Sequence, residues 1–208
     1  DLHSTSRRQR QMCIRDSNNI HKPALLGMLG AIVGYGGYAQ QRDEDMYPEY
    51  YARLKDLKVS IVPISDNDGV FSKKMQAFNN SVGYASKEEG GNLIVREQWL
   101  EDPCWDIYII DDGSEGYRAV EEHILSSKAE FIPYLGKNDH IAVIEDQEVI
   151  EVEATDSNMI DSIVIDNNFD VKNCEGYSLF CEYVPVAMDS VYNHAIYAKS
   201  IFTDAEYN

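Results

Sequence analysis

The 208-residue sequence predicts an α+β fold, and three observations lead to this prediction. The stretch His21–Gln40 is the longest apolar run of the chain, and we expect it to form a buried helix. Segments rich in β-branched residues, such as Lys58–Ile64, alternate with turn-forming residues, which is typical of strands. Ser114 precedes an amphipathic segment, which is the pattern of a capped helix. The length is sufficient for one sizeable domain.

The predicted helix within His21–Gln40 is rich in glycine. Pro23 suits its first turn, where a missing N–H costs nothing. Gly27, Gly30 and Gly34 recur at spacings of three and four residues and leave one smooth face. Each glycine in a helix interior costs about 0.5–1 kcal/mol relative to alanine. We therefore expect another backbone, of protein or nucleic acid, to approach closely at this face.

A signal peptide or a membrane helix is the alternative interpretation of this stretch. Arginines precede it, and Ala39 resembles the end of a signal sequence. The Gly30/Gly34 pair also matches the small-xxx-small pattern of membrane helices. However, the apolar run of about 16 residues is shorter than the roughly 20 that span a bilayer. Since the four cysteines show no metal-site spacing or disulfide framework, we predict a cytoplasmic protein without a membrane segment.

Residues 1–17 do not resemble part of a fold. They are polar, have no hydrophobic period and include four arginines. The string DLHSTSRRQRQMCIRDS resembles the peptide obtained when a sequencing adapter is translated, and the alternative is a disordered basic arm. We therefore treat residues 1–17 as a foreign or disordered segment and exclude them from the fold.

A short helix, a strand and a long insertion are predicted next. Asp45–Leu57 has the pattern of an amphipathic helix, and Lys58–Ile64 that of a strand whose Pro63 places its end near a sheet edge. Residues 65–93 are irregular and contain lysines, aromatic residues and asparagines. A loop of this length in a compact domain is usually functional or disordered. We therefore expect a functional insertion at about residues 65–93.

The rest of the chain completes an alternation of strands and helices. A strand is predicted at Trp105–Ile110 and a helix at Glu115–Ser127. Further strands are predicted at Ile141–Ile144, Glu148–Glu153, Ser162–Ile165, Ser178–Val186 and Ala195–Phe202. With one strand added before Pro23, the order becomes βαββαβ, the ferredoxin-like (RRM-like) unit. We therefore predict a ferredoxin-like domain over residues 18–144 whose first strand is missing, and a β-rich extension over residues 145–208.

Acidic residues are concentrated in the C-terminal third. The formal net charge is −18. Residues 139–208 contain two basic and 15 acidic side chains, a net charge of −13, and residues 18–138 contain 12 basic and 19 acidic side chains, a net charge of −7. Because an acidic surface repels phosphate, any nucleic-acid interface belongs to the first two thirds of the chain.

The sequence shows no catalytic or metal-binding pattern. Its five histidines are scattered and form no HExxH motif. Nucleophile elbows and nucleotide-binding glycine loops are also missing. The paired carboxylates Asp111-Asp112 and Glu121-Glu122 are typical of the surface of an acidic chain. We therefore predict a protein that is not an enzyme and uses no metal or cofactor.

Four sequence blocks resemble a known family. They are KPALLGMLGAIVGYGGYA, REQWLEDPCWDIYI, FIPYLGKNDHIA and CEYVPVAM. In this order and spacing they are similar to the Cas-five family of CRISPR-associated RAMP proteins, which are subunits of type I Cascade complexes, and they look closest to type I-B. The similarity covers residues 18–208, and the missing first strand departs from the family pattern.

The resemblance implies a RAMP domain with a β-hairpin thumb inserted at about residues 65–93. It implies a non-catalytic subunit that binds the 5′ handle of the CRISPR RNA (crRNA) and caps the backbone filament in antiviral defence. The implied partners are crRNA, the Cascade backbone and large subunits, and target DNA through the complex. Lysines can meet phosphates, and rings such as Phe71 can stack on bases. The expected crRNA-binding residues are Lys22, Lys73, Lys74, Phe78, Asn79, Tyr84, Arg96 and Gln98.

Two other functions stay open. In type I-C systems, a branch of the family cleaves precursor crRNA with a tyrosine and a basic Lys–His pair. The second-strand region of this chain contains no histidine, but Tyr35, Lys73 and His123 could meet in space and act as a metal-independent endoribonuclease. The third hypothesis is a protein-interaction module that binds no RNA and docks through the glycine-rich helix.

Overall fold

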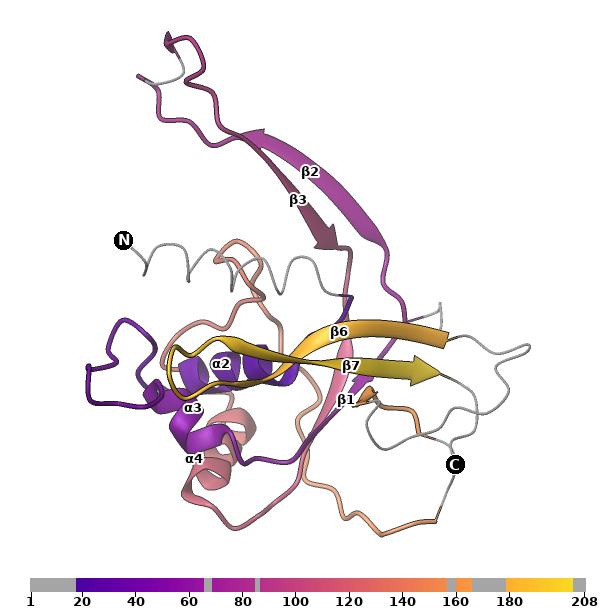
Figure 1. Ribbon diagram of the computed structural model, residues 1–208. Coiled ribbons are helices and arrows are strands. Elements are labelled where there is room, and N and C mark those ends of the chain that lie inside the picture. Colours follow the sequence, from indigo (N-terminus) through magenta and orange to yellow (C-terminus); the bar gives the residue numbers. More distant parts are fainter. Residues whose placement is uncertain (1–17, 66–68, 85–86, 157–159, 166–178, 204–208) are drawn as a thin grey trace.

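The computed structural model describes residues 18–65, 69–84, 87–156, 160–165 and 179–203, so the predicted foreign segment 1–17 lies outside the described residues (Figure 1). Its helices are α2 (Lys22–Val33), α3 (Glu49–Leu54) and α4 (Glu115–Leu125). Its strands are β1 (Val59–Pro63), β2 (Lys73–Asn79), β3 (Ile94–Leu100), β4 (Trp105–Ile109), β5 (Val164–Ile165), β6 (Leu179–Met188) and β7 (Ala195–Thr203). These elements make an α+β fold with small antiparallel sheets, as the sequence predicts at this level.

Helix α2 is the buried centre of the fold. His21 caps its N-terminus, since the imidazole Nδ1 accepts the Ala24 N–H at 3.3 Å, and Pro23 occupies the first turn as predicted. The helix ends earlier than the apolar run suggests. Gly34 adopts the left-handed conformation, with φ of 90°, and its N–H donates to the Gly30 carbonyl. This C-terminal cap stops the helix at Val33.

The glycine face of α2 receives helix α3 of the same chain. A Cβ atom added at Gly30 would lie less than 3.0 Å from the Tyr50 Cβ, and one added at Gly27 would lie 3.7 Å from the Tyr50 ring. A Cβ at Gly34 would meet the Glu130 side chain at 3.0 Å. The close approach predicted for this face is therefore confirmed, but the neighbour is the same chain and not RNA or another subunit. The glycines allow two helices of one chain to pack closely.

Strands β1 and β4 form an antiparallel pair beside these helices. The register aligns Ile61 with Ile107 and Pro63 with Trp105. Ile61 is buried in the core, and the three alternate residues of β4, Trp105, Ile107 and Ile109, pack against it. The two strands predicted around Pro63 and Trp105 are therefore confirmed.

Helix α4 begins and ends close to the positions predicted from its cap. The Ser114 hydroxyl accepts the Tyr117 N–H at 3.0 Å. Val120 is buried, and Gly116 lies against the backbone carbonyl of Arg53 at the end of α3. Because a side chain at residue 116 would meet that carbonyl, the glycine lets α4 pack closely on α3.

Strands β2 and β3 form a hairpin that projects from the body of the protein (Figure 1). Its register pairs Lys73 with Leu100 and Asn79 with Ile94. The insertion predicted at residues 65–93 is thus the first arm and tip of a hairpin whose second arm reaches Leu100. The predicted end of the insertion at residue 93 is therefore too early. The sequence of β3 alternates like that of a core strand, so the sequence gives no sign that β3 belongs to the hairpin.

The C-terminal part contains a three-stranded antiparallel sheet in the order β5-β7-β6. A register shift between Pro185 and Ala187 interrupts the pairing of β6 with β7. The strands predicted at Ile141–Ile144 and Glu148–Glu153 are not formed. Ile141 makes a single bridge to Tyr134, and the rest of both segments has no strand pairing.

Candidate nucleic-acid interface

The β2–β3 hairpin has two different faces because side chains alternate along each strand. The cross-strand pairs Lys73/Leu100, Met75/Gln98, Ala77/Arg96 and Asn79/Ile94 share one face. The pairs Lys74/Trp99, Gln76/Glu97 and Phe78/Val95 share the other. We call the first the open face and the second the anchored face. The predicted RNA-binding residues of the hairpin are divided between them.

The open face carries two cations that are available to an anionic ligand. Lys73 and Arg96 are exposed, and neither makes an ion pair within the described part of the chain. Gln98 lies between them on the same face, and the exposed side chains of Met75 and Ile94 add apolar surface. This combination of cations, an amide and apolar side chains suits a nucleic-acid strand, which presents phosphates, base edges and base faces.

The anchored face is held by a lysine that was not among the residues predicted from the sequence. Lys137 forms an ion pair with the buried Glu97. Its Nζ also lies 4.9 Å from the centre of the Phe78 ring and 5.6 Å from that of Trp99. Trp99 Nε1–H donates to Glu97 at 3.1 Å, and the Trp99 ring meets His140 edge-to-face at 4.8 Å.

These contacts fix the hairpin to the loop that contains Lys137 and His140. Phe78 is therefore partly covered by its own chain, although it was predicted to stack on RNA. Lys74 lies on the same face, opposite Trp99. The sequence offered one signal for this contact, because Lys137 and His140 both lie in the block FIPYLGKNDHIA.

The tip of the hairpin contains the exposed Tyr84. The Tyr84 side chain is 77% exposed and is therefore open to stacking. Asn79 has a structural role there. Its Nδ2 donates to the Asn92 Oδ1 at 2.9 Å, and its Oδ1 accepts hydrogen bonds from both the N–H and the hydroxyl of Ser81.

Phe71, at the base of the hairpin, does not offer a free stacking face. It is 6% exposed and meets Trp105 edge-to-face with ring centres 5.2 Å apart. The expectation that its ring stacks on a base is therefore wrong. It joins the hairpin to the core.

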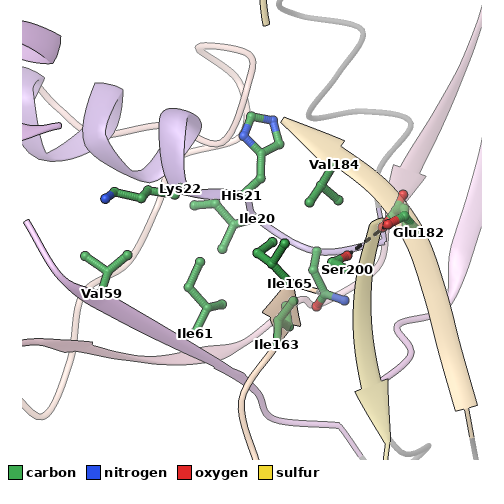
Figure 2. A pocket seen from close by; sticks show the side chains of 11 residues that line it. Ile20, His21, Lys22, Val59, Ile61, Ile163, Ile165, Glu182, Val184 and Ser200 are labelled. Carbon is green, nitrogen blue, oxygen red and sulfur yellow. Dashed lines mark hydrogen bonds between the residues drawn. The ribbon is translucent and has the colours of Figure 1, made fainter. Parts of the chain in front are cut away.

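Lys22 lies beside a small cavity at the start of α2 (Figure 2). The cavity has a volume of about 110 Å³. At about 30 Å³ for each water molecule, this space holds a few waters. Ligand pockets are commonly about 300–1,000 Å³. The walls are mainly apolar, formed by Ile20, Val59, Ile61, Ile163, Ile165 and Val184, with Asn19, His21, Glu182 and Ser200 as polar neighbours. This cavity does not fit a nucleotide.

Burial changes the acid–base properties of the groups around this cavity. It lowers the pKa of the His21 imidazole to about 4, so the ring is neutral at pH 7. Because Nδ1 accepts from Ala24, Nε2 carries the proton, and this buried N–H has no partner. Burial also raises the pKa of Glu182. The hydrogen bond from the Asn18 N–H and the charge of Lys73 lower this pKa and so offset part of the rise. It lowers the pKa of Lys22, against the opposing charge of Asp56.

The possible nuclease residues are not brought together. Lys73 acts on Glu182, which accepts the N–H of Asn18 just before α2. Tyr35 lies beyond the other end of α2, under the Arg53 guanidinium. A 12-residue helix is roughly 18 Å long. The idea that Lys73, Tyr35 and His123 meet is therefore not supported.

One adjacent His–Lys pair, His21-Lys22, does occur in the chain. It was not among the nuclease candidates predicted from the sequence. Its imidazole is buried and serves as a helix cap, so it is not placed for proton transfer with a substrate.

The described residues contain neither a metal-binding cluster nor a helix that could span a membrane. Among the described residues no group of three or more histidines, cysteines or carboxylates is arranged to hold a metal ion. None of the described helices has the length and apolar composition needed to cross a bilayer. Neither a scan of protein-family models nor a search of curated proteins found a match to this chain.

Proposed function

We propose that this chain is a non-catalytic subunit of a type I CRISPR Cascade complex and binds the 5′ handle of crRNA. The observation that carries the proposal is the open face of the projecting hairpin, which Lys73, Arg96 and Gln98 share. Two exposed cations on one ribbon can contact phosphates of one RNA strand. Tyr84 at the tip can stack on a base.

The proposal includes a finer fold. The antiparallel pairing of β1 with β4 and the helices α2 and α4 are compatible with the αββα part of the βαββαβ unit of a ferredoxin-like RAMP domain. The β2–β3 hairpin would then be the thumb. The four blocks that resemble the Cas-five family fall on α2, on β3 with β4, on the loop that holds the hairpin, and on β6.

The proposed partners follow from this role. The chain would contact crRNA and the backbone and large subunits of the complex in the cytoplasm, and target DNA only through the assembly. The net charge of −18 disfavours tight binding of RNA by the isolated chain. We therefore expect weak binding alone and tight binding in the assembly.

Fluorescence anisotropy with a labelled handle RNA tests the proposal, both with the chain alone and with its partner subunits. The double variant Lys73→Ala/Arg96→Ala should weaken binding by about tenfold or more, because hydrogen bonds to charged groups contribute about 1.5–3 kcal/mol each. The dependence of log K on log salt should also flatten by about 0.7 for each RNA phosphate that the variant no longer neutralises on the single strand.

Lys128→Ala is the matched control, since Lys128 is an exposed lysine outside the hairpin, just after α4. It should leave both affinity and salt slope unchanged. If folded protein bound no handle RNA in either format, the proposal would be wrong. Equal losses of affinity in the control and in the double variant would place the RNA elsewhere. Precursor crRNA should stay intact during the same incubation without metal, and specific cleavage would indicate an endoribonuclease instead.

A further inference from the structure

The β2–β3 hairpin depends on the body of the protein for a fixed position. Within the part of the chain that the structure describes, β2 and β3 pair with each other in a sheet of two strands. A hairpin of two strands is marginally stable in water on its own. Phe71 is buried against Trp105 and holds the base of the hairpin. The paired strands beyond the base therefore need a second support.

Lys137 supplies this support further along the strands. It lies in the loop that follows α4, and its Nζ forms an ion pair with Glu97. The same Nζ lies over the rings of Phe78 and Trp99, and Phe78 is the penultimate residue of β2. The Lys137 and Glu97 side chains are 20% and 5% exposed. Because a pair that is partly buried is screened little by salt, this contact holds most of the paired length against the body.

The loop that presents Lys137 is itself fixed by hydrogen bonds. The Leu135 N–H donates to the His140 carbonyl at 2.7 Å, and the His140 N–H donates to the Lys137 carbonyl at 3.0 Å. Earlier in the same segment, the Glu130 N–H donates to the Ile32 carbonyl at 2.8 Å, near the end of α2. The segment therefore connects the buried helix α2 to the hairpin.

Lys137 and the proposed RNA face lie on opposite sides of β3. Glu97 points to the anchored face, and its neighbours Arg96 and Gln98 point to the open face. Lys137 is therefore not placed to contact RNA on the open face. However, its ion pair fixes the strand between Arg96 and Gln98, where the side chains of the open face arise.

A fixed hairpin is expected to raise the affinity for RNA. A protein whose binding-competent conformation is only partly populated loses affinity in proportion to that fraction. When the hairpin is ordered before binding, Arg96 and Gln98 already lie in register with Lys73. A loose hairpin has to be ordered during binding, and the cost of ordering is subtracted from the affinity.

We propose that Lys137 is a positioning residue for RNA binding, which acts by pairing with Glu97 and does not touch the RNA. This inference rests on the proposed function. Coupling between two equilibria is reciprocal. If the Lys137 contact raises the affinity for RNA, then RNA bound on the open face stabilises the loop around Lys137 by the same factor.

Affinity and its salt dependence give the first test, with handle RNA and the full chain, alone and with its partner subunits. Lys137→Met should weaken binding about tenfold, as expected when the ordered hairpin falls to about a tenth of the population. The slope of log K against log salt should stay unchanged, because Lys137 neutralises no phosphate. The double variant Lys137→Met/Glu97→Gln should recover part of the affinity, since it leaves no buried charge unpaired. Lys128→Met, at an exposed lysine outside the hairpin, is the matched control and should bind like the wild type.

Amide hydrogen exchange at saturating RNA gives the second test, because it detects the coupling itself. In the wild type, bound RNA should slow the exchange of the Leu135 and His140 amides by up to about tenfold, the factor expected for the affinity. In Lys137→Met at saturation, RNA should leave both amides unchanged. Equal protection in the two proteins would show that RNA contacts the loop directly, which overturns the proposal.

The failure of this inference differs from the failure of the proposed function. If the wild type bound no handle RNA in either format, the proposed function would be wrong and this inference with it. If the wild type bound RNA and Lys137→Met bound it equally well, only the inference would be overturned. A flatter salt slope in Lys137→Met would make Lys137 a direct phosphate contact, which also overturns it.

Discussion

At the scale of single residues, Gly30 sets how closely α2 and α3 approach. An alanine Cβ there would overlap the Tyr50 Cβ, which is bonded to the backbone and cannot turn away. Gly30→Ala should therefore lower the free energy of unfolding by about 1–3 kcal/mol, as overpacking does, despite the better helix propensity of alanine. Gly27→Ala is the control, because its Cβ would make an ordinary contact with the Tyr50 ring. Urea unfolding should show that Gly27→Ala leaves the free energy of unfolding unchanged or raises it by up to about 1 kcal/mol. Similar losses of stability in both variants would contradict the packing argument.

His21 links stability to pH. Its pKa is about 4 in the folded chain, against an ordinary value of 6.5, so the unfolded chain binds more protons between these values. Its contribution is complete above pH 6.5 and is lost as the pH falls towards 4, which amounts to roughly 3 kcal/mol. His21→Asn keeps a good helix cap but does not titrate. Urea unfolding at pH 7 and pH 4 should show that the variant loses roughly 3 kcal/mol less than the wild type. An identical loss in both proteins would show that His21 is not responsible.

At the scale of elements, Lys137 holds the hairpin against the body. Lys137→Met keeps much of the side-chain volume but removes the cation that pairs with the buried Glu97. Removing one partner of a buried pair costs about 3–5 kcal/mol, whereas replacing both costs less. Hydrogen exchange in β2 and β3 should therefore accelerate in Lys137→Met and recover in part in the double variant Lys137→Met/Glu97→Gln. A double variant as mobile as the single one would show that the charge pair does not hold the hairpin.

At the scale of the whole molecule, exposed apolar residues predict self-association of the isolated chain. Ile132, Val143, Val149 and Val152 are 64–76% exposed and lie in a segment with little secondary structure. Large apolar patches on monomeric proteins usually mark interaction sites or cause aggregation. Sedimentation velocity should show species that grow with protein concentration. Val143→Lys/Val149→Lys should suppress them without changing the thermal midpoint by more than a few degrees, since surface substitutions cost little. A monomer at all concentrations would contradict this prediction.

Local chemistry made several elements predictable from the sequence alone. The Ser114 hydroxyl, Pro23 and the alternation around Ile61 and Trp105 act over a few residues, so their helices and strands could be assigned without knowledge of the rest of the chain. The α+β class follows from them. The hairpin was located as an insertion, but its second arm was not, because β3 has no local signal that separates it from a core strand.

Long-range packing decided the rest. The glycine face of α2 is filled by Tyr50, which lies beyond the loop that joins α2 to α3, and no local pattern identifies that partner. The alternation of side chains in the β2–β3 hairpin places Lys73 and Lys74 on opposite faces. Lys137 contacts Phe78 and Glu97, which are far from it in the sequence. Ile141–Ile144 has a strand pattern but lacks a partner along its length, and a strand exists only when another backbone satisfies its N–H and C=O groups. The sequence by itself determined the capped helices and the paired strands β1 and β4, and the tertiary structure determined which other segments become strands and which surfaces they leave open.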